Sequence, residues 1–264
     1  MNDLSATQIS YIQKHKHHVI KVRILRVLIL ILFLLLWEIC AATELIDPFI
    51  FSSPSRVILC FLDMLHSNQL TLHIGITLFE TIASFFIVIG CTLLFATLLW
   101  LSKSVSETLE PYLIVLNSLP KSALAPLLIV WLGGSYKTII VTGISVAVFG
   151  SILSLYHAFM NADKEEMLLI RTLGGNRRDI LLKIMLPGNI PTLLSIMKVN
   201  IGLCLVGVII GEFIAAKQGL GYLIIYGSQV FKLDWVILSI ILLCLIALLL
   251  YQIISRLEKR YTRR

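Results

Sequence analysis

The sequence predicts an all-α integral membrane protein with about six transmembrane helices and both termini in the cytoplasm. Of its 264 residues, 58% are hydrophobic and only 14% are charged, whereas soluble domains carry about 25% charged residues. The apolar residues form long runs, and a helix needs roughly 20 such residues to cross a bilayer. The net charge of +7 comes from basic residues that lie between these runs, which suits the ends of membrane spans and argues against nucleic-acid binding.

Six apolar segments are long enough to cross the bilayer: 24–46, 72–101, 111–132, 137–157, 190–214 and 234–254. Residues 1–23 precede them as a basic cytoplasmic segment, and residues 24–264 form a single transmembrane domain. The first apolar run is too long for a signal peptide, so we expect it to be retained as a span. Between the first two spans, apolar residues recur at helical spacing over a shorter length, which predicts an interfacial helix.

The distribution of lysine and arginine sets the orientation. With the N-terminus inside, sixteen of these residues lie in cytoplasmic segments and four lie outside, namely Arg56, Lys137, Lys217 and Lys232. Cytoplasmic segments are enriched in lysine and arginine. The sequence therefore predicts a multi-pass membrane protein with cytoplasmic ends.

One polar stretch, from Asn161 to Pro187, interrupts the apolar chain between the fourth and fifth spans. Asp163 and Glu166 form a helix start of capping-box type, and Gly174 supplies a stop. Asn176 can cap a second helix, which we expect to end at Pro187. The predicted loop, at about 158–189, is therefore a helix, a glycine turn and a helix. Its apolar stripes, broken by arginines, suit either a helix on anionic headgroups or a docking site for a soluble partner.

Five motifs occur in order along most of the chain from about Ser53. The loop reads G-x9-I-x-L-P, and it is preceded by "SSPSRV", "HIGITL" and "LPKSALAPLLIVWLGG" and followed by "GEFIAAKQGLGYLI". Together they resemble the binding-protein-dependent ABC importer permeases, of the nitrate, sulfonate and taurine type and their thiamine-precursor relatives. The resemblance implies a type I importer fold in the bacterial plasma membrane.

The resemblance also implies that the polar loop is a coupling element seated in a groove of a separate ATPase. The residues it assigns to this role are Glu165, Glu166, Leu168, Arg171, Gly174, Ile184, Leu186 and Pro187. Where the family has Glu-Ala-Ala before the loop glycine, this chain has Leu168, Leu169 and Ile170, so an apolar contact could replace the polar one.

Partners follow from the same resemblance. The chain has no G-x4-G-K-[ST] sequence for phosphate binding, so ATP and Mg²⁺ are expected on the ATPase subunit. We expect this chain to bind no cofactor or metal and to have no catalytic residue. Besides the ATPase, we expect an extracytoplasmic solute-binding protein, a second copy of the permease in a homodimer, and the lipid bilayer.

Polar residues inside the third predicted span share one helical face. Asn117, Lys121 and Ser122 are expected to line the translocation path, because polar groups within spans usually face a cavity or a partner. Pro120 and Pro126 free backbone carbonyl groups on the same span. The alternative role for this face is contact between helices.

Two further predictions concern charged residues within the membrane. Glu80 and Lys198 differ in depth by about 4 Å at 1.5 Å per residue, so we expect an ion pair in preference to a proton relay. Glu212 with Gly219 and Gly221 resembles the family's re-entrant gate near the outer mouth. An ordinary surface loop is the alternative.

Two other classes of function compete with the importer subunit. A secondary transporter driven by ion gradients is expected to show internal repeats, and a membrane-embedded enzyme needs a clustered nucleophile or metal ligands. Neither pattern is evident. For the substrate, Lys121 and Lys198 favour a small anion such as a sulfonate, taurine or nitrate. A thiamine pyrimidine precursor or another small heterocycle is the alternative.

Overall fold

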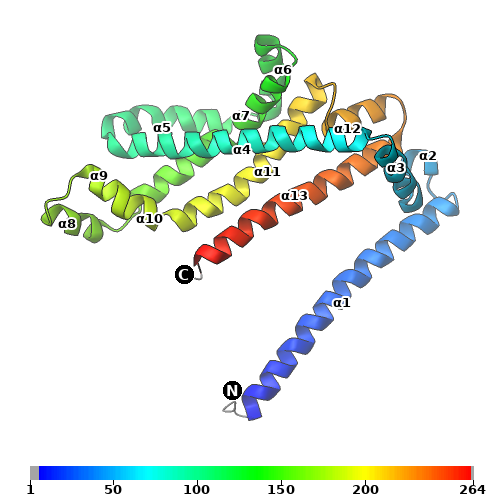
Figure 1. Cartoon of the computed structure of the whole chain (residues 1–264), viewed down its shortest axis with the longest axis horizontal. Helices are drawn as coiled ribbons and strands as arrows, with labels where there is room; N and C mark the ends of the chain where they lie inside the picture. Colours follow the sequence, from blue (N-terminus) through cyan, green and yellow to red (C-terminus); the bar gives the residue numbers. More distant parts are fainter. Residues whose placement is uncertain (1–5, 263–264) are drawn as a thin grey trace. The chain divides into compact units, whose positions relative to one another are not determined.

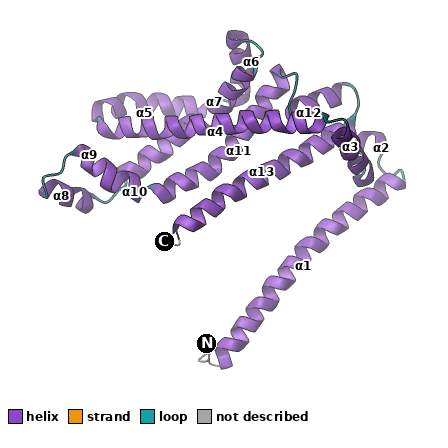
Figure 2. Ribbon diagram, in the orientation of Figure 1, coloured by secondary structure: helices purple, strands orange, loops and turns teal. Residues whose placement is uncertain are grey.

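The computed structural model describes residues 6–262, and all the regular structure in that range is helical (Figures 1 and 2). The chain divides into two compact units after Asp63. The first unit contains α1 (Ala6–Ala42), α2 (Pro48–Phe51) and most of α3 (Pro54–His66).

Within the first unit, α3 is held to α1 by a carboxylate. Glu38 accepts hydrogen bonds from the Ser55 backbone N–H at 3.0 Å and from the Ser55 hydroxyl at 2.7 Å. These bonds satisfy one of the free N–H groups at the start of α3. The helix is 13 residues long, too short to cross a bilayer, which agrees with the short helix predicted between the first two spans.

The second unit contains the remaining helices. They are α4 (Gln69–Leu101), α5 (Lys103–Ser118), α6 (Lys121–Leu132), α7 (Tyr136–Met160), α8 (Lys164–Thr172), α9 (Arg177–Ile180), a π-helical turn η1 (Leu181–Met185), α10 (Leu186–Gly188), α11 (Ile190–Ala215), α12 (Leu220–Gln229) and α13 (Leu233–Thr262). Figure 1 shows α8, α9 and α10 at one end of this unit and α12 at the other.

Four helices within residues 6–262 are long and apolar enough to cross a membrane, namely α4, α7, α11 and α13. The pair α5 and α6 adds a fifth if it counts as one broken span. The predicted all-helical membrane fold is confirmed, with four or five of the expected spans counted within residues 6–262. Most of the predicted first span lies in α1, which is not among them.

The predicted third span, 111–132, is not one straight helix. α5 and α6 meet at an angle of 98°. Proline disfavours the helical conformation of the residue before it and lacks an N–H to continue a helix. Accordingly, Leu119 is extended, with a ψ of 140°, and α6 begins directly after Pro120.

The centre of the second unit is formed by α4, α7 and α11, which pack against one another. α7 and α11 approach closely at two glycines: a Cβ on Gly207 would lie 2.8 Å from the Gly143 Cα. Small residues are typical of such contacts, because lipid tails offer helices little hydrophobic gain and backbone approach must supply the packing energy. This packing fixes the long helices that carry the sites described next.

Candidate functional site

The polar loop folds as a helix, a glycine turn and a second helical segment, as predicted. The Asp163 carboxylate caps α8 by accepting from the Glu165 N–H at 2.8 Å, rather than forming the predicted capping box with Glu166. Gly174 has a φ of +81°, a conformation that only glycine adopts at low cost. Gly175 is required for space, since a Cβ there would lie 2.4 Å from the Ile170 Cγ2.

The second half of the loop begins at a complete capping box. The Asn176 side chain accepts from the N–H groups of Arg178 and Asp179, and Asp179 accepts from the Asn176 N–H at 3.0 Å. That N–H bond, followed by a hydrogen bond from Lys183, lowers the pKa of the Asp179 carboxyl. The cap therefore keeps its charge throughout the neutral range.

The second helical segment ends one residue beyond the predicted Pro187. Helical structure continues through η1 and α10 to Gly188. Proline is tolerated in the first turn of a helix, where its missing N–H has no intrahelical partner, and Pro187 occupies that position in α10.

One side of the loop is fixed to the helices above it. Ile180 and Met185 are 1% and 0% exposed and belong to the same buried cluster as Leu99 and Phe159. The Arg177 guanidinium also donates to the Leu101 carbonyl oxygen at 2.7 Å. Leu101 is the last residue of α4, and carbonyl groups at a helix end lack an intrahelical donor. The loop is thus attached to the end of α4 by a hydrogen bond and by buried apolar contacts.

At the other end of the unit, a stripe of buried polar residues runs along α4. The residues are His73, Thr77, Glu80 and Ser84, spaced as on one face of a helix. His73 and Thr77 face the turn between α11 and α12, whereas the Ser84 hydroxyl donates to the Ile140 carbonyl oxygen of α7 at 3.1 Å. The Thr77 hydroxyl donates to Glu212 at 2.7 Å and accepts from the Leu220 N–H at 2.9 Å. The Nδ1 atom of His73 accepts from the Gly219 N–H at 2.9 Å.

Glu212 is the centre of this network. It is 1% exposed, and it accepts from the Gly221 N–H at 2.5 Å as well as from Thr77. Gly219 has a φ of +115°, and a Cβ there would lie 2.4 Å from the Glu212 carboxyl carbon. The predicted gate residues Glu212, Gly219 and Gly221 are thus brought together, with the carboxylate packed directly against both glycines.

The predicted ion pair between Glu80 and Lys198 does not form. The Lys198 ammonium lies 2.7 Å from a Glu258 carboxylate oxygen on α13, and Glu80 instead shares a hydrogen bond with Glu212. The prediction used only the similar depths of Glu80 and Lys198 in the bilayer. Depth does not determine which neighbouring helix each side chain faces.

The predicted path residues lie where the broken span bends. The Lys121 ammonium donates to the carbonyl oxygens of Leu116 and Asn117 at the end of α5, which lack intrahelical donors. Asn117 and Ser122 are exposed. Asn117 also borders a cavity of about 440 Å³ between α7 and α11, where the Ser151 hydroxyl donates to Asn200 at 2.7 Å.

Sequence reasoning missed several residues that the structure places in these networks. His73 and Thr77 were noted only as part of a motif, although their spacing with Glu80 marks one helical face and could have identified the stripe. Glu258 and Asn200 carry no such signal, because their partners are distant in sequence and depend on helix packing.

Comparison with known proteins identifies the family to which the chain belongs. The class that the fold defines is a multi-span helical membrane protein with a compact helical loop at one end. Residues 87–263 match the model of the "Binding-protein-dependent transport system inner membrane component", so the chain belongs to that family. It is an ABC importer permease subunit of the inner membrane; in this family ATP hydrolysis belongs to a separate subunit, and a solute-binding protein is implied.

Individual relatives agree. The chain is 24% identical to the formylaminopyrimidine transport permease protein ThiX of Halalkalibacterium halodurans, covering 88% of this chain and 92% of that protein. It is 24% identical to the taurine transport system permease protein TauC of Escherichia coli, covering 88% and 86%. It resembles in fold a bacterial ABC transporter involved in alginate import, with a TM-score of 0.66, 15% identity, and coverage of 93% and 99%.

Proposed function

We propose that residues 161–189 form the surface through which this permease subunit receives movement from its ATPase. One observation supports the proposal most directly: this loop presents large apolar side chains that the second unit leaves uncovered. Their exposed fractions lie between 58% and 75%, and they are Leu168, Leu169, Leu173 and Leu182. Burying a leucine side chain is worth about 1.5–3 kcal/mol, so a partner that covers them gains substantial affinity.

The opposite side of the loop makes it suitable as a lever. Ile180 and Met185 are buried in the core, and Arg177 holds the end of α4. A partner that displaces the exposed leucines therefore displaces α4 and α11 rather than a loose loop. Leu168 and Leu169 stand where the family has Glu-Ala, so an apolar contact takes the place of a polar one.

Charged residues on the same surface add specificity. Glu165, Glu166 and Arg171 are exposed, and exposed charges at the rim of an interface act mainly on orientation and association rate. Ile184, Leu186 and Pro187 then carry the chain from this surface into α11. ATP and Mg²⁺ are bound by the ATPase.

Two copies of the chain form the translocation pathway in this proposal. A single copy supplies one loop and leaves Asn117 and Ser122 exposed, although polar groups at membrane depth need a partner or a water-filled path. Lys121 orders the bend beside them by holding the end of α5. The turn carrying Glu212, Gly219 and Gly221 acts as the outer gate.

Measuring the association of this permease with its ATPase subunit tests the docking surface. Leu169→Ala combined with Leu173→Ala is expected to weaken association at least tenfold, measured by fluorescence titration in nanodiscs. Leu72→Ala removes a leucine that is 49% exposed at the other end of α4 and is the matched control.

Unchanged affinity in the double variant would overturn the proposal. A loop that rests on headgroups instead would keep a fluorophore at position 169 accessible to brominated lipid after the ATPase has bound. A docked loop is expected to lose that quenching.

A further inference from the structure

A cavity of about 510 Å³ lies beside the gate network. It is bounded by the first half of α4, the start of α7 and the turn after α11. Pockets that bind small molecules usually have volumes of about 300–1,000 Å³. With the predicted orientation, the three bounding segments are the outer ends of their helices, so the cavity faces the side from which solute arrives.

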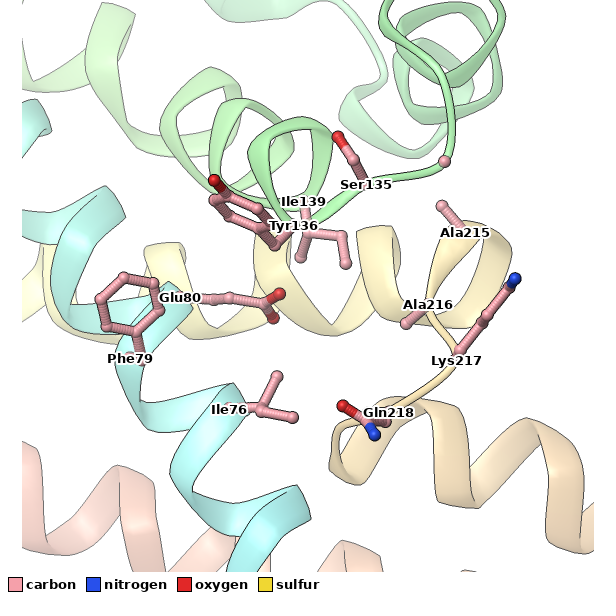
Figure 3. Close-up of a pocket in the computed structure, with 11 residues that line it drawn as sticks. Ile76, Phe79, Glu80, Ser135, Tyr136, Ile139, Ala215, Ala216, Lys217 and Gln218 are labelled. Atoms are coloured by element: carbon pink, nitrogen blue, oxygen red, sulfur yellow. The ribbon is translucent and has the colours of Figure 1, made fainter.

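Glu80 is the unusual residue in this cavity. Its side chain is 1% exposed, yet its Oε2 atom has no hydrogen-bond partner among the described residues. Figure 3 shows the carboxyl group pointing into the cavity. A buried polar atom without a partner costs about 1–3 kcal/mol, and nearly all such atoms in proteins are paired. This atom is itself almost inaccessible to solvent, so a ligand must displace a neighbouring side chain slightly to reach it. A donor that does so satisfies a polar group that otherwise has no partner.

The rest of the lining defines what that ligand must look like. Ile76, Phe79 and Ile139 give the cavity apolar walls. Figure 3 shows the Gln218 amide across the cavity from Glu80, while the Lys217 ammonium points away from Glu80. Lys217 is exposed, and within residues 6–262 no ion pair joins Glu80 to a basic residue. An acidic group and an amide thus face each other between apolar surfaces.

We infer that this cavity binds the transported solute, and that the solute is a compact ring bearing an amino group. The ring lies between the apolar walls, an N–H group donates to the Glu80 Oε2 atom, and Gln218 binds a ring nitrogen or a second N–H. An anion such as a simple sulfonate would instead bring its oxygens against a carboxyl oxygen. The inference rests on the proposed function only in taking the ligand to be the solute.

The two lysines within the predicted spans are not available to bind an anionic solute. Both Lys121 and Lys198 are occupied, the first by carbonyl oxygens and the second by Glu258. The described cavities therefore offer a buried carboxyl group but no buried ammonium. A cavity with a buried carboxyl group and no buried ammonium group favours a solute that donates an N–H group over an anionic solute.

Binding of three probes to the permease–ATPase complex in nanodiscs tests the inference by calorimetry. 4-Aminopyrimidine is expected to bind, whereas pyrimidine, which lacks the amino group, and methanesulfonate are expected to bind at least tenfold more weakly. Glu80→Met, which leaves no side-chain oxygen to accept the N–H group, is expected to weaken 4-aminopyrimidine binding at least tenfold. Ile76→Phe, which fills the cavity from another wall, is expected to do the same. Glu107→Met, at an exposed glutamate on α5, is the matched control.

Two outcomes overturn the inference. One is tighter binding of methanesulfonate that is weakened by Lys217→Gln. The other is an equal loss of 4-aminopyrimidine binding in Thr77→Val, which breaks the contact to Glu212 but leaves the Glu80 carboxyl in place; Glu80 would then act through the gate rather than on the ligand.

Failure of this inference is distinct from failure of the proposed function. If the complex assembles and hydrolyses ATP but none of the probes binds, the solute assignment is wrong and the coupling surface stands. If the ATPase does not associate, the coupling proposal fails, and the same titrations on the permease alone still report on the cavity.

Discussion

The gate network and the polar loop lie at opposite ends of the second unit. They differ in which side chains they bury: the gate buries polar side chains, and the loop leaves apolar side chains exposed. At the gate, Thr77, Glu80 and Glu212 are polar and at most 1% exposed, and hydrogen bonds hold them. In the loop, Leu169 and Leu173 are apolar and more than half exposed. A buried polar network fixes one geometry because each broken bond is costly, whereas an exposed apolar surface awaits a partner. The comparison predicts that gate variants lose stability and loop variants lose association.

The largest expected effect is at Gly219. An alanine there must adopt a positive φ with an extended ψ, which costs about 1–3 kcal/mol, and its Cβ would collide with Glu212 and break bonds worth about 1–3 kcal/mol. We expect Gly219→Ala to lower the free energy of unfolding in detergent by about 3 kcal/mol. Gly202→Ala is the control, because nothing lies within 4 Å of a Cβ at that position of α11. Equal melting temperatures for the two variants would show that the turn is not rigid.

Thr77→Val comes next. It keeps the shape of the side chain but leaves Glu212 without one donor and the Leu220 N–H without its acceptor. The expected loss is about 2 kcal/mol, since each unsatisfied buried group costs about 1–3 kcal/mol. Thr71→Val, on the exposed first turn of α4, is expected to change stability by less than about 0.5 kcal/mol. Thermal unfolding of both variants side by side measures the difference.

Gly175→Ala sharpens the other half of the comparison. Its Cβ would press on Ile170 and shift α8 relative to α9, so we expect about fivefold weaker association with the ATPase and little loss of overall stability. Gly188→Ala has open space and serves as control. Adding Ile170→Ala to Gly175→Ala is expected to restore only part of the affinity, because the Ile170 carbonyl oxygen also lies 2.9 Å from that Cβ. Unchanged affinity in Gly175→Ala itself would contradict the steric explanation.

The smallest effect concerns pH. The pKa of Asp179 is lowered in the folded protein, so its contribution to the Asn176 cap is present above the unfolded pKa and is lost as pH falls through the folded value. Hydrogen exchange at residues 176–181, corrected for intrinsic rates, is expected to be constant from pH 8 to 5. Protection should fade only below the ordinary aspartate range, and Asp179→Asn should remove that transition.

The sequence allowed the loop to be predicted better than the gate, for physical reasons. Gly174 and Asn176 act through local backbone geometry, which residue type largely determines. The bend at Pro120 was visible as a break, but its angle depends on what α5 and α6 pack against. The pairing of Lys198 with Glu258 depends on the rotation of α11 and α13 about their axes, which hydropathy does not specify. The spacing of the polar residues on α4 could have predicted the stripe, but it could not have predicted which helix packs against it.

The bond between Arg177 and the Leu101 carbonyl joins the loop to a helix of 33 residues, about 50 Å long at 1.5 Å per residue. Glu80 lies on the same helix, toward its other end. Thermodynamic reciprocity then applies: if nucleotide on the ATPase changes solute affinity beside Glu80 by some factor, solute must change nucleotide affinity by that same factor. An empty transporter and a loaded one would therefore differ in how tightly they hold ATP.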